Sequence, residues 1–380
     1  MPDAPTMADP FRPVSPPPRI AGRPLPLVGR ARMYVCGITP YDTTHLGHAA
    51  TFVWADVVVR VLRHVGVEVD MCRNVTDVDD VLTRAAERAG SPYDSFAAVQ
   101  QFHFEQDMAA LSVRRPTLEP RAHNYVRQVI ALAQALLDGG HAYLRDGTVY
   151  FRGSAVPGSA GLDIETASQL AHEYGDHPDS PAKDDPFDVA VWQASGDGEP
   201  AWPSPWGLGR PGWHAECAAM ALTSYGPSLD LHAGGADLRF PHHAYEAAMV
   251  ETVTGVRPFA RSWLHAGVVR VGGAKMAKSA GNLVFVSDLL EDHPAGAVRL
   301  LLTDRRYDAG WDYTAANLGA AAARLERLYG AAGRSGSDDA AQQRATRALL
   351  DDLDVTTVLD IAEEAGGQAA RTVLSVLALQ

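Results

Sequence analysis

The feature that most constrains the fold is a succession of strand, loop, long helix and strand between residues 31 and 72. Residues 31–37 (ARMYVCG) have the composition of a buried strand, and apolar residues recur at helical spacing from Leu46 to about Val65. Residues 67–72 return as a second strand. Because this order is that of a βαβ unit, it predicts a parallel sheet that binds ligands at the carboxyl ends of its strands.

The rest of the chain predicts a second α/β stretch and a helical tail. Residues 80–140 have a helical pattern, whereas 141–210 are rich in Gly, Pro and Asp and predict irregular structure. Further along we expect a strand near 228–232, a helix near 242–253, a strand near 263–271, and helices from 295 onward with a polar loop at 330–343. The predicted fold class is α/β, with a Rossmann-like nucleotide-binding parallel sheet, an inserted segment and a C-terminal helical bundle.

The first 30 residues differ in composition from the rest. They hold nine of the 25 prolines, which exclude a sustained helix or internal strand and predict a mobile or surface-draped arm. The chain therefore divides into an arm (1–30), a catalytic domain (31–294) containing an insertion or connective segment (141–210), and a helical domain (295–380).

Composition excludes several classes of protein. With 33 Lys and Arg against 46 Asp and Glu, the net charge of −13 argues against broad nucleic-acid binding. The hydrophobic fraction of 46% excludes a largely disordered chain. Three cysteines are too few for a disulfide framework and fit a reducing cytoplasm, and the sequence has neither a long apolar run nor a signal-peptide pattern. We expect a cytoplasmic protein that does not bind membranes.

A first candidate for chemistry is His45-Leu46-Gly47-His48, where the loop after the first strand enters the long helix. A helix N-terminus suits phosphate, and glycine allows a nucleotide to approach closely. Both imidazoles would stabilise charge on a phosphorus undergoing displacement. Taken alone, the same residues also fit a helix cap at His45 and a packed side chain at His48.

A second candidate is the loop Lys275-Met276-Ala277-Lys278-Ser279, flanked by glycines at 272, 273 and 281. Its two lysines could clamp a triphosphate, and the flexible flanks would let the loop close over it. Taken alone, the segment also fits a solvated turn.

Together the two segments resemble a known family. HLGH (45–48) and KMAKS (275–279) are similar to the two signatures of class I aminoacyl-tRNA synthetases, which join a carboxylate to AMP using ATP. The surrounding sequence resembles cysteinyl-tRNA synthetase and its relative, the mycothiol-pathway cysteine ligase. The stretches that carry the likeness are 33–51 (MYVCGITPYDTTHLGHAAT), 73–80 (RNVTDVDD), 203–222 (PSPWGLGRPGWHAECAAMAL), 234–243 (GGADLRFPHH) and 281–289 (GNLVFVSDL).

The resemblance implies one zinc ion per chain. Its ligands would be Cys36, Cys217, His242 and Glu246, with Glu246 matching the synthetase more closely than the ligase. His242 and Glu246 are four residues apart, which places them on one face of a helix. A pocket alone would separate cysteine from serine poorly, since one small group is worth only about 1–3 kcal/mol, whereas a thiolate on zinc is a bond that serine cannot match. The cysteines would otherwise be buried core residues, which we expect of Cys72.

The resemblance also assigns catalysis and binding. His45, His48, Lys275 and Lys278 would stabilise the transferring phosphate, with Mg²⁺ accompanying ATP. Asp237 would pair with the substrate ammonium and Thr76 with its carboxylate, while Asp79 and Asp80 fit the start of a helix. The residues that would line the pocket for cysteinyl-AMP are Cys36, Gly37, Ile38, Thr39, Gly47, Thr51, Asn74, Val75, Thr76, Trp213, Gly235, Ala236, Asp237 and Val269.

The acceptor of the activated cysteine separates the two relatives. A synthetase transfers cysteine to tRNA, whereas the ligase transfers it to the amine of glucosaminyl-inositol. The motif CGITPYD (36–42) resembles the ligase, and the short tail after Asn282 leaves no room for an anticodon-binding domain. Residues 341–364 carry two Arg and six Asp and Glu, which further argues against tRNA. We expect ATP, L-cysteine and a small-molecule amine, with glucosaminyl-inositol first.

Three departures from the ligase pattern leave the acceptor open. Where the ligase has Glu-Arg-Gly-Gly-Asp-Pro, this chain has EYGDHP (173–178), and Ala277 replaces a serine of the lysine signature. His232 and Glu246 resemble the synthetase more than the ligase. Together these changes fit a paralogue that couples cysteine to another amine. The sequence is also compatible with a short cysteinyl-tRNA synthetase and with a non-catalytic binding module on the same fold.

Overall fold

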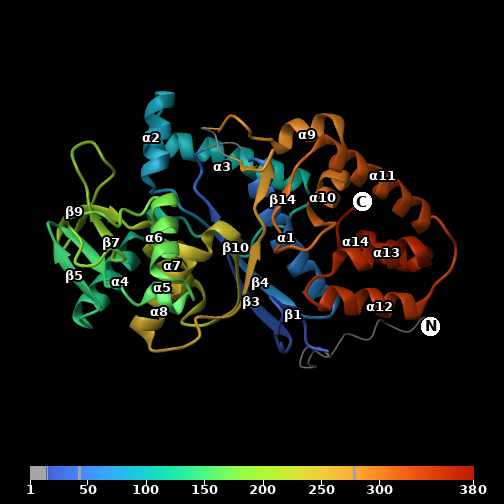
Figure 1. Cartoon of the computed structure of the whole chain (residues 1–380), viewed down its shortest axis with the longest axis horizontal. Coiled ribbons are helices and arrows are strands. Elements are labelled where there is room, and N and C mark those ends of the chain that lie inside the picture. Colours follow the sequence, from blue (N-terminus) through green and yellow to red (C-terminus); the bar gives the residue numbers. More distant parts are fainter. Residues whose placement is uncertain (1–13, 15, 42–43, 277–279) are drawn as a thin grey trace, which may run out of the picture.

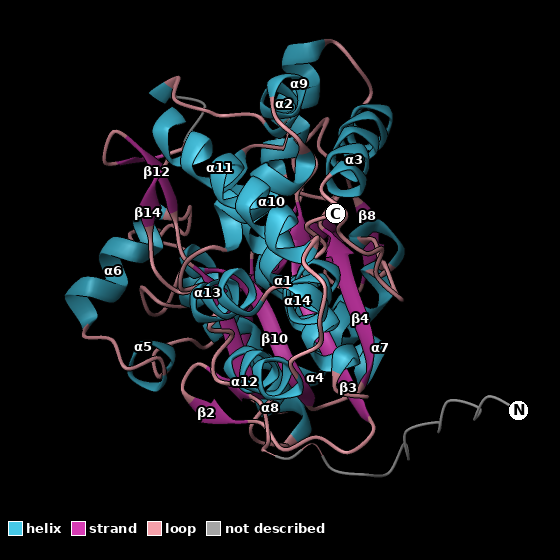
Figure 2. Ribbon diagram, turned by 90° about the vertical axis from the view of Figure 1, so that its right-hand side faces the viewer, coloured by secondary structure: helices cyan, strands magenta, loops and turns pink. Residues whose placement is uncertain are grey.

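The centre of the molecule is a four-stranded parallel sheet. In the computed structural model, residues 14, 16–41, 44–276 and 280–380 are described. The strand order is β11-β10-β3-β4, and every neighbouring pair is parallel. Figure 2 shows β10, β3 and β4 of this sheet among the surrounding helices. The predicted fold class is therefore confirmed. The strands are β3 (Arg30–Ile38), β4 (Glu68–Val75), β10 (Leu229–Gly235) and β11 (Ala260–Ala266).

The predicted βαβ unit lies at the middle of this sheet. The helix α1 (Leu46–His64) joins β3 to β4 and packs on the sheet, where Val53, Val57 and Val61 are fully buried. Its apolar side chains are buried on both sides because α10 and α14 pack against its outer surface. The opposite face of the sheet is covered by α7 (Trp213–Tyr225), which contacts α4 and α8.

The strand order creates a crevice at the carboxyl end of the sheet. From β3 the chain passes to β4 on one side, whereas β10 and β11 extend the sheet on the other side. The strand order thus reverses between β3 and β10, which is where open α/β sheets bind ligands. Cys36 and Gly37 lie at this end of β3, and Gly235 closes β10. The remaining elements of this region are α2 (Asp80–Ala89), α3 (Tyr93–Ala110), η1 (Ala122–Asn124), α4 (Val126–Asp138), η2 (Ala236–Leu238), η3 (Arg239–His243), α8 (Ala244–Thr254), β12 (Val269–Val271), β13 (Ala274–Lys275) and α9 (Val286–Asp292).

The segment 141–210 is more regular than its composition predicts. It forms most of a five-stranded sheet in the order β5-β6-β7-β9-β8, antiparallel throughout, seen at the left of Figure 1. Glycines and prolines interrupt strands of three to six residues, so no periodic run is long enough to recognise. The elements are β5 (Ala142–Arg145), β6 (Thr148–Phe151), α5 (Val156–Ser159), α6 (Ile164–Glu173), β7 (Val189–Ala194), β8 (Trp202–Ser204) and β9 (Gly207–Pro211).

The C-terminal region is helical, as predicted, and packs against α1 (Figure 1). The predicted loop at 330–343 is shorter, because Ala332 ends one helix and Asp338 caps the next by accepting a hydrogen bond from the N–H of Ala341. The elements are α10 (Ala295–Thr303), β14 (Trp311–Asp312), α11 (Ala315–Ala332), α12 (Asp339–Leu350), α13 (Val355–Ala365) and α14 (Gly367–Val376).

The apolar core under α1 continues without a break into these C-terminal helices. A buried ion pair joins the guanidinium of Arg299 on α10 to Asp56 on α1, and Arg299 also donates to the backbone oxygens of Leu111 and Leu377. Leaving either charge without its partner would be costly at this depth. The domain boundaries at residues 30 and 294 stay predictions.

The described part of the N-terminal segment lies beside β11, the edge strand of the sheet, and contacts Tyr307 of the C-terminal region. A short antiparallel hairpin precedes β3, and its two strands, β1 (Arg19–Ile20) and β2 (Arg23–Pro24), have two residues each. Ile20, Leu25 and Leu27 are buried. Apolar side chains therefore attach this part of the proline-rich segment to the core. Within the described residues, no helix is both long enough and apolar enough to cross a membrane.

Candidate active site

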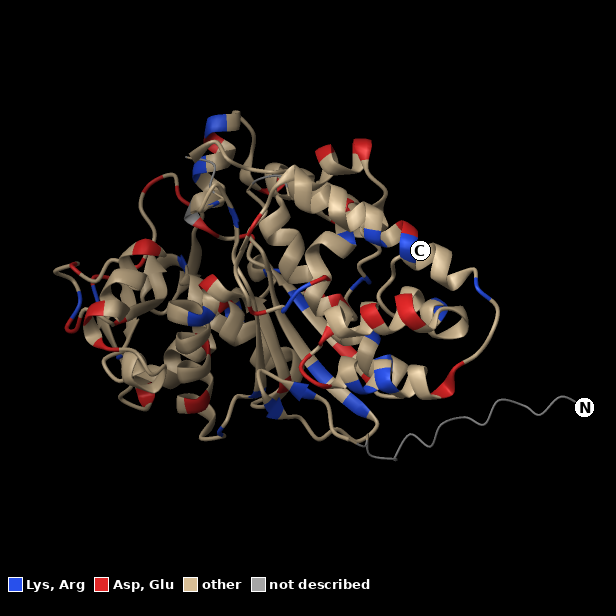
Figure 3. Cartoon of the chain, turned by 45° about the vertical axis from the view of Figure 1, so that its right-hand side comes forward, with Lys and Arg blue, Asp and Glu red and all other residues tan. Residues whose placement is uncertain are grey.

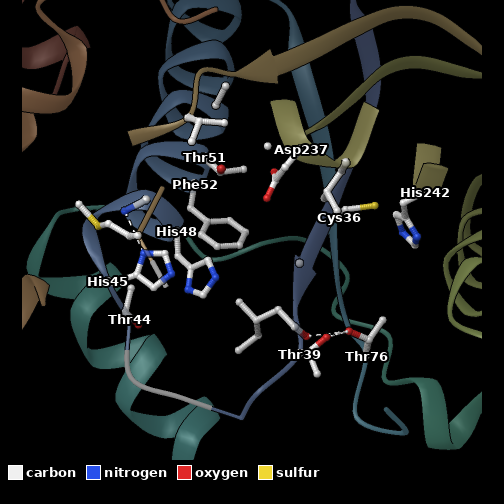
Figure 4. Close-up of a pocket in the computed structure, with 18 of the residues that line it drawn as sticks. Cys36, Thr39, Thr44, His45, His48, Thr51, Phe52, Thr76, Asp237 and His242 are labelled. Carbon is white, nitrogen blue, oxygen red and sulfur yellow. Dashed lines mark hydrogen bonds between the residues drawn. The ribbon is translucent and has the colours of Figure 1, made fainter. Parts of the chain in front are cut away.

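A cavity of about 310 Å³ occupies the crevice at the carboxyl end of the sheet. Its walls come from the ends of β3 and β4, the start of α1, the start of α7, the turn after β10 and the β12–β13 hairpin. Figure 4 shows His45 and His48 at one end and Cys36 and His242 at the other, with Asp237 between them. Two segments distant in sequence, the histidine and lysine signatures, thus meet at one cavity.

The histidine signature forms the first turn of α1. His45 is the N-cap residue, and its Nδ1 accepts a hydrogen bond from the N–H of Gly47 at 3.1 Å. The ring of His48 stacks on it, with centroids 3.9 Å apart. Burial, with smaller contributions from His48 and Lys275, lowers the pKa of His45 to about 3. His45 is therefore a neutral imidazole whose Nε2 carries the proton, so it offers the cavity a hydrogen-bond donor at the helix N-terminus.

The lysine signature contributes Lys275 from β13. Its ammonium lies 2.8 Å from the carboxylate of Asp237 and 4.8 Å from the ring centre of Tyr174. Both glycines before it, Gly272 and Gly273, have positive φ, so the hairpin turn requires residues without a side chain. Lys278, the second predicted lysine, lies outside the described residues.

A hydrogen-bond network fixes the floor of the cavity. The N–H of Gly37 donates to Oδ1 of Asn74 at 2.7 Å, and Nδ2 of Asn74 lies 3.2 Å from Sγ of Cys217. A Cβ at position 37 would lie 1.7 Å from the backbone oxygen of Asn74, so only glycine fits. The hydroxyls of Thr39 and Thr76 are 2.7 Å apart, which ties the ends of β3 and β4 together.

Three of the four predicted zinc ligands lie together. One ligand atom each of Cys36, Cys217 and His242 falls within 4.8 Å of the others, and the two sulfurs are 3.9 Å apart without a disulfide. All three side chains are buried. In front of them the indole of Trp213 stacks on His242, with ring centres 4.4 Å apart.

Glu246 belongs to a second, overlapping set. Its Oε2 lies 3.8 Å from Sγ of Cys36, while its Oε1 accepts from Nε2 of His232 at 3.0 Å. The set is completed by His243. His242 precedes α8, which begins at Ala244, and Phe240, where the helical backbone is interrupted, lies before His242. That His242 and Glu246 share one helical face stays a prediction, although the two side chains fall in different groups around Cys36. His242 groups with Cys217, and Glu246 with the histidines.

These donors fit a zinc ion. Two thiols and an imidazole within 4.8 Å form the sulfur and nitrogen set that zinc prefers, and Cys36 belongs to both groups. Burial raises the pKa of the thiols of Cys36 and Cys217, so a bound zinc ion would have to displace their protons. Nδ1 of His232 and Nε2 of His243 are buried and accept or donate no hydrogen bond among the described residues.

Most predicted site residues line the cavity. Val75 ends β4 and Ala236 begins the turn after β10, but neither residue reaches the wall of the cavity. Glu246 does not line the cavity either, and it contacts Cys36. Asp79, expected at a helix start, is the N-cap of α2. The predicted residues at the cavity wall are Cys36, Gly37, Ile38, Thr39, His45, Gly47, His48, Thr51, Asn74, Thr76, Trp213, Cys217, Gly235, Asp237, His242, Val269 and Lys275.

Sequence reasoning missed two groups of residues. Phe52, Phe104 and Tyr174 line the cavity, although the first two have the spacing of ordinary core residues. A cluster of histidines surrounds the cysteines: His214 Nδ1 lies 2.9 Å from His242, and His243 lies 2.9 Å from His265. The signal for His214 was its place three residues before Cys217 on one helix.

The comparison of the sequence with protein families gives the class. The family described as the tRNA synthetases class I (C) catalytic domain matches residues 26–323. The chain belongs to this family.

Similar proteins fall into two groups. The L-cysteine:1D-myo-inositol 2-amino-2-deoxy-alpha-D-glucopyranoside ligase of Nocardia farcinica is 46% identical over 87% of this chain and 83% of that protein. The cysteine–tRNA ligase of Halorhodospira halophila is 42% identical over 93% of this chain and 75% of that protein. Among solved structures, methionyl-tRNA synthetase of Mycobacterium tuberculosis with methionyl-adenylate has a TM-score of 0.63 at 18% identity, covering 92% of this chain and 82% of that one. The last comparison supports the fold.

Proposed function

We propose that this protein activates L-cysteine with ATP and transfers it to the primary amine of glucosaminyl-inositol. The single observation that carries the proposal is the meeting of His45, Lys275, Asp237 and the Cys36–Cys217 pair around one cavity. Each end of that cavity suits one part of cysteinyl-AMP: nitrogen donors for phosphate, a carboxylate for the ammonium and sulfur ligands for a metal that selects the thiol.

Activation occurs at the histidine end. An oxygen of the cysteine carboxylate bonds to the α-phosphorus of ATP, and the bond to pyrophosphate breaks with its electron pair leaving on pyrophosphate. His45 donates through Nε2, and His48 and Lys275 stabilise the charge that develops on the phosphate oxygens. Lys278 would act with them, and Mg²⁺ would accompany ATP, as is typical of this class.

Recognition of cysteine occurs at the other end. Among the described residues that line the cavity, Asp237 is the sole carboxylate, so it is the partner for the substrate ammonium. Cys36, Cys217 and His242 would hold zinc, with Glu246 as a further ligand from the overlapping set. When bound, zinc supplies a soft-ligand bond to a thiol that the hydroxyl of serine does not match.

Transfer completes the reaction. The acceptor loses its ammonium proton to water, and the free amine bonds to the carbonyl carbon of the adenylate. The bond from that carbon to the phosphate oxygen then breaks, its electron pair leaves on AMP, and the nitrogen loses a second proton to water. The products are one amide and one AMP.

Transfer to tRNA is the second candidate, because a cysteine–tRNA ligase is among the similar proteins. The acidity of residues 341–364 counts against tRNA less than the sequence suggests. Asp360 and Glu363 form ion pairs with Arg324, while Asp351 and Asp352 pair with Arg19 and Arg306. Figure 3 accordingly shows acidic and basic residues interspersed on the C-terminal helices.

Cysteine-dependent exchange between ATP and labelled pyrophosphate tests the proposal. We expect exchange with cysteine and at least about 100-fold less with serine, because a thiol-selective site gains what a pocket alone does not. An absence of exchange in zinc-loaded protein would overturn the activation step and favour a non-catalytic binding module.

A further inference from the structure

A second cavity of about 550 Å³ adjoins the candidate active site. Both cavities are lined by Thr39, Tyr41, Tyr174 and Trp213, so they meet along a shared wall. The second cavity extends away from the sheet, between the start of α2 and the antiparallel sheet of the inserted segment. An acceptor seated there would face the adenylate across the shared residues. None of the residues assigned to cysteine activation other than Thr39 and Trp213 lies in it.

The lining of the second cavity suits a small polar ligand. Hydroxyl and amide groups come from Thr148, Tyr150 and Gln193 of β6 and β7. Both signs of charge are present, with Asp176 and Lys183 on the segment that follows α6. Such a mixture matches a molecule with many hydroxyl groups and one ammonium, because each hydroxyl both donates and accepts hydrogen bonds.

The charges have defined partners. Oδ2 of Asp176 lies 3.3 Å from Nε2 of His214, and the pKa of Asp176 is held below its ordinary value by His214 and Lys183, against the opposing effect of burial. Asp176 is therefore ionised at neutral pH and available to a cation. It lies two residues from Tyr174, which is at the junction of the cavities.

The wall of this cavity is also where the sequence departs from the ligase pattern. Tyr174, Gly175, Asp176 and His177 all line it, and they are the segment in which the arginine of the ligase pattern is absent. The other departures are Ala277, which lies outside the described residues, and His232 and Glu246 beside Cys36, which resemble the synthetase. The longest departure therefore lies in the wall of the second cavity, where an acceptor would bind.

We propose that the second cavity is the acceptor site, that it takes a polyhydroxylated primary amine, and that residues 174–177 with Gln193 determine which amine is accepted. The inference rests on the proposed function and adds the place and the determinants of acceptor choice. Asp176 pairs with the ammonium before its proton is lost, and Gln193 with Thr148 holds hydroxyl groups. A sugar ring packs on the aromatic surfaces of Tyr174 and Trp213.

The test compares Gln193→Leu with Gln134→Leu. Gln193 faces the second cavity, whereas Gln134 lies on α4 and bonds to Asp138 outside it. Two quantities are measured on zinc-loaded full-length protein: cysteine-dependent pyrophosphate exchange, and the Kd of glucosaminyl-inositol by calorimetry. We expect Gln193→Leu to raise the Kd at least fivefold and to change exchange less than twofold, and Gln134→Leu to change neither.

A second variant, Asp176→Asn, extends the test to the ammonium. We expect it to weaken glucosaminyl-inositol binding at least tenfold and to leave binding of the uncharged analogue, with hydroxyl in place of the amine, within twofold. Zinc content is measured as well, because His214 links Asp176 to His242. Equal weakening of both ligands would overturn the role of Asp176.

The results separate the two levels of the proposal. Absence of exchange in the unmodified protein overturns the proposed function. Normal exchange with an unchanged Kd in Gln193→Leu overturns the acceptor site. The acceptor site is also overturned if the protein binds no amine and transfers cysteine to tRNA equally well with and without Gln193→Leu. A third variant, His177→Asp, restores a carboxylate of the ligase pattern. It should change the ratio of the Kd values of different amino sugars by at least threefold. His141→Asp, at an exposed position, is its control.

Discussion

The ammonium of Lys275 lies 2.8 Å from the carboxylate of Asp237, across the cavity in which cysteine and ATP would meet. Lys275 comes from a hairpin and Asp237 from the turn after β10, so the contact joins the nucleotide side of the site to the amino-acid side. If the ammonium of cysteine pairs with the carboxylate of Asp237, the ammonium of Lys275 is released and can bind phosphate. Binding of the two substrates should therefore be coupled.

We predict that Asp237→Asn raises the KM for cysteine at least tenfold, which corresponds to about 1.4 kcal/mol. In the unmodified protein, a non-reactive cysteine analogue should lower the Kd of ATP, and in Asp237→Asn this effect should disappear. Calorimetry with and without the analogue measures both. Asp308→Asn, which alters an exposed ion pair with Arg306, is the control, and coupling that persists in Asp237→Asn would contradict the prediction.

Cys217→Ser should lower zinc content and the preference for cysteine over serine together. Cys217 lies beside Cys36 and His242, whereas Cys72 is buried against Ser224, so Cys72→Ser is a matched control that should keep its zinc. Metal analysis and exchange with each amino acid provide the readouts. Loss of zinc with unchanged discrimination would show that the metal has another role.

His45 should make the protein sensitive to acid. Its pKa is about 3 in the folded protein and 6.5 in the unfolded chain, so the unfolded state binds the proton first as the pH falls. The stability due to the neutral ring is complete above pH 6.5 and is lost between pH 6.5 and 3. His45→Asn should reduce the loss between pH 7 and pH 5 by about 1 kcal/mol, since solvent reaches part of the ring.

Urea unfolding at the two pH values measures this difference. His141→Asn, in an exposed turn, provides the comparison and should follow the unmodified protein. An identical acid dependence in His45→Asn would contradict the assignment of a neutral, buried imidazole.

Gly37→Ala should destabilise the protein by about 3 kcal/mol or more, because the added Cβ would overlap the backbone oxygen of Asn74. The same change at Gly158 meets no atom within 4 Å and lies in a short helix. Thermal unfolding should separate the two variants by several degrees. Equal melting temperatures would show that the strand end can move to accept a side chain.

The sequence predicts the elements with a long, uniform period. The helix predicted from Leu46 to about Val65 is observed from Leu46 to His64, because thirteen of its residues are buried and repeat the same pattern. The inserted sheet was missed, since strands such as Trp202–Ser204 are too short to show alternation. These strands form a regular sheet because they pair with segments that are distant in sequence, and local composition does not reveal such pairing.

The site is predicted less completely from local pattern. The two cysteines are 181 residues apart, and only the resemblance to a family brought them together. The contact of Glu246 with His232 and that of Lys275 with Asp237 depend on the fold alone, because neither pair is close in sequence. The position of the acceptor cavity likewise follows from how the inserted segment packs against α2.

Mass spectrometry of the products formed from L-cysteine, ATP and glucosaminyl-inositol tests the proposed reaction most directly. We expect the amide of cysteine with the amine, one AMP and one pyrophosphate per amide, and far less product when serine replaces cysteine. Cysteine found attached to tRNA alone, or no amide while the adenylate accumulates, would contradict it.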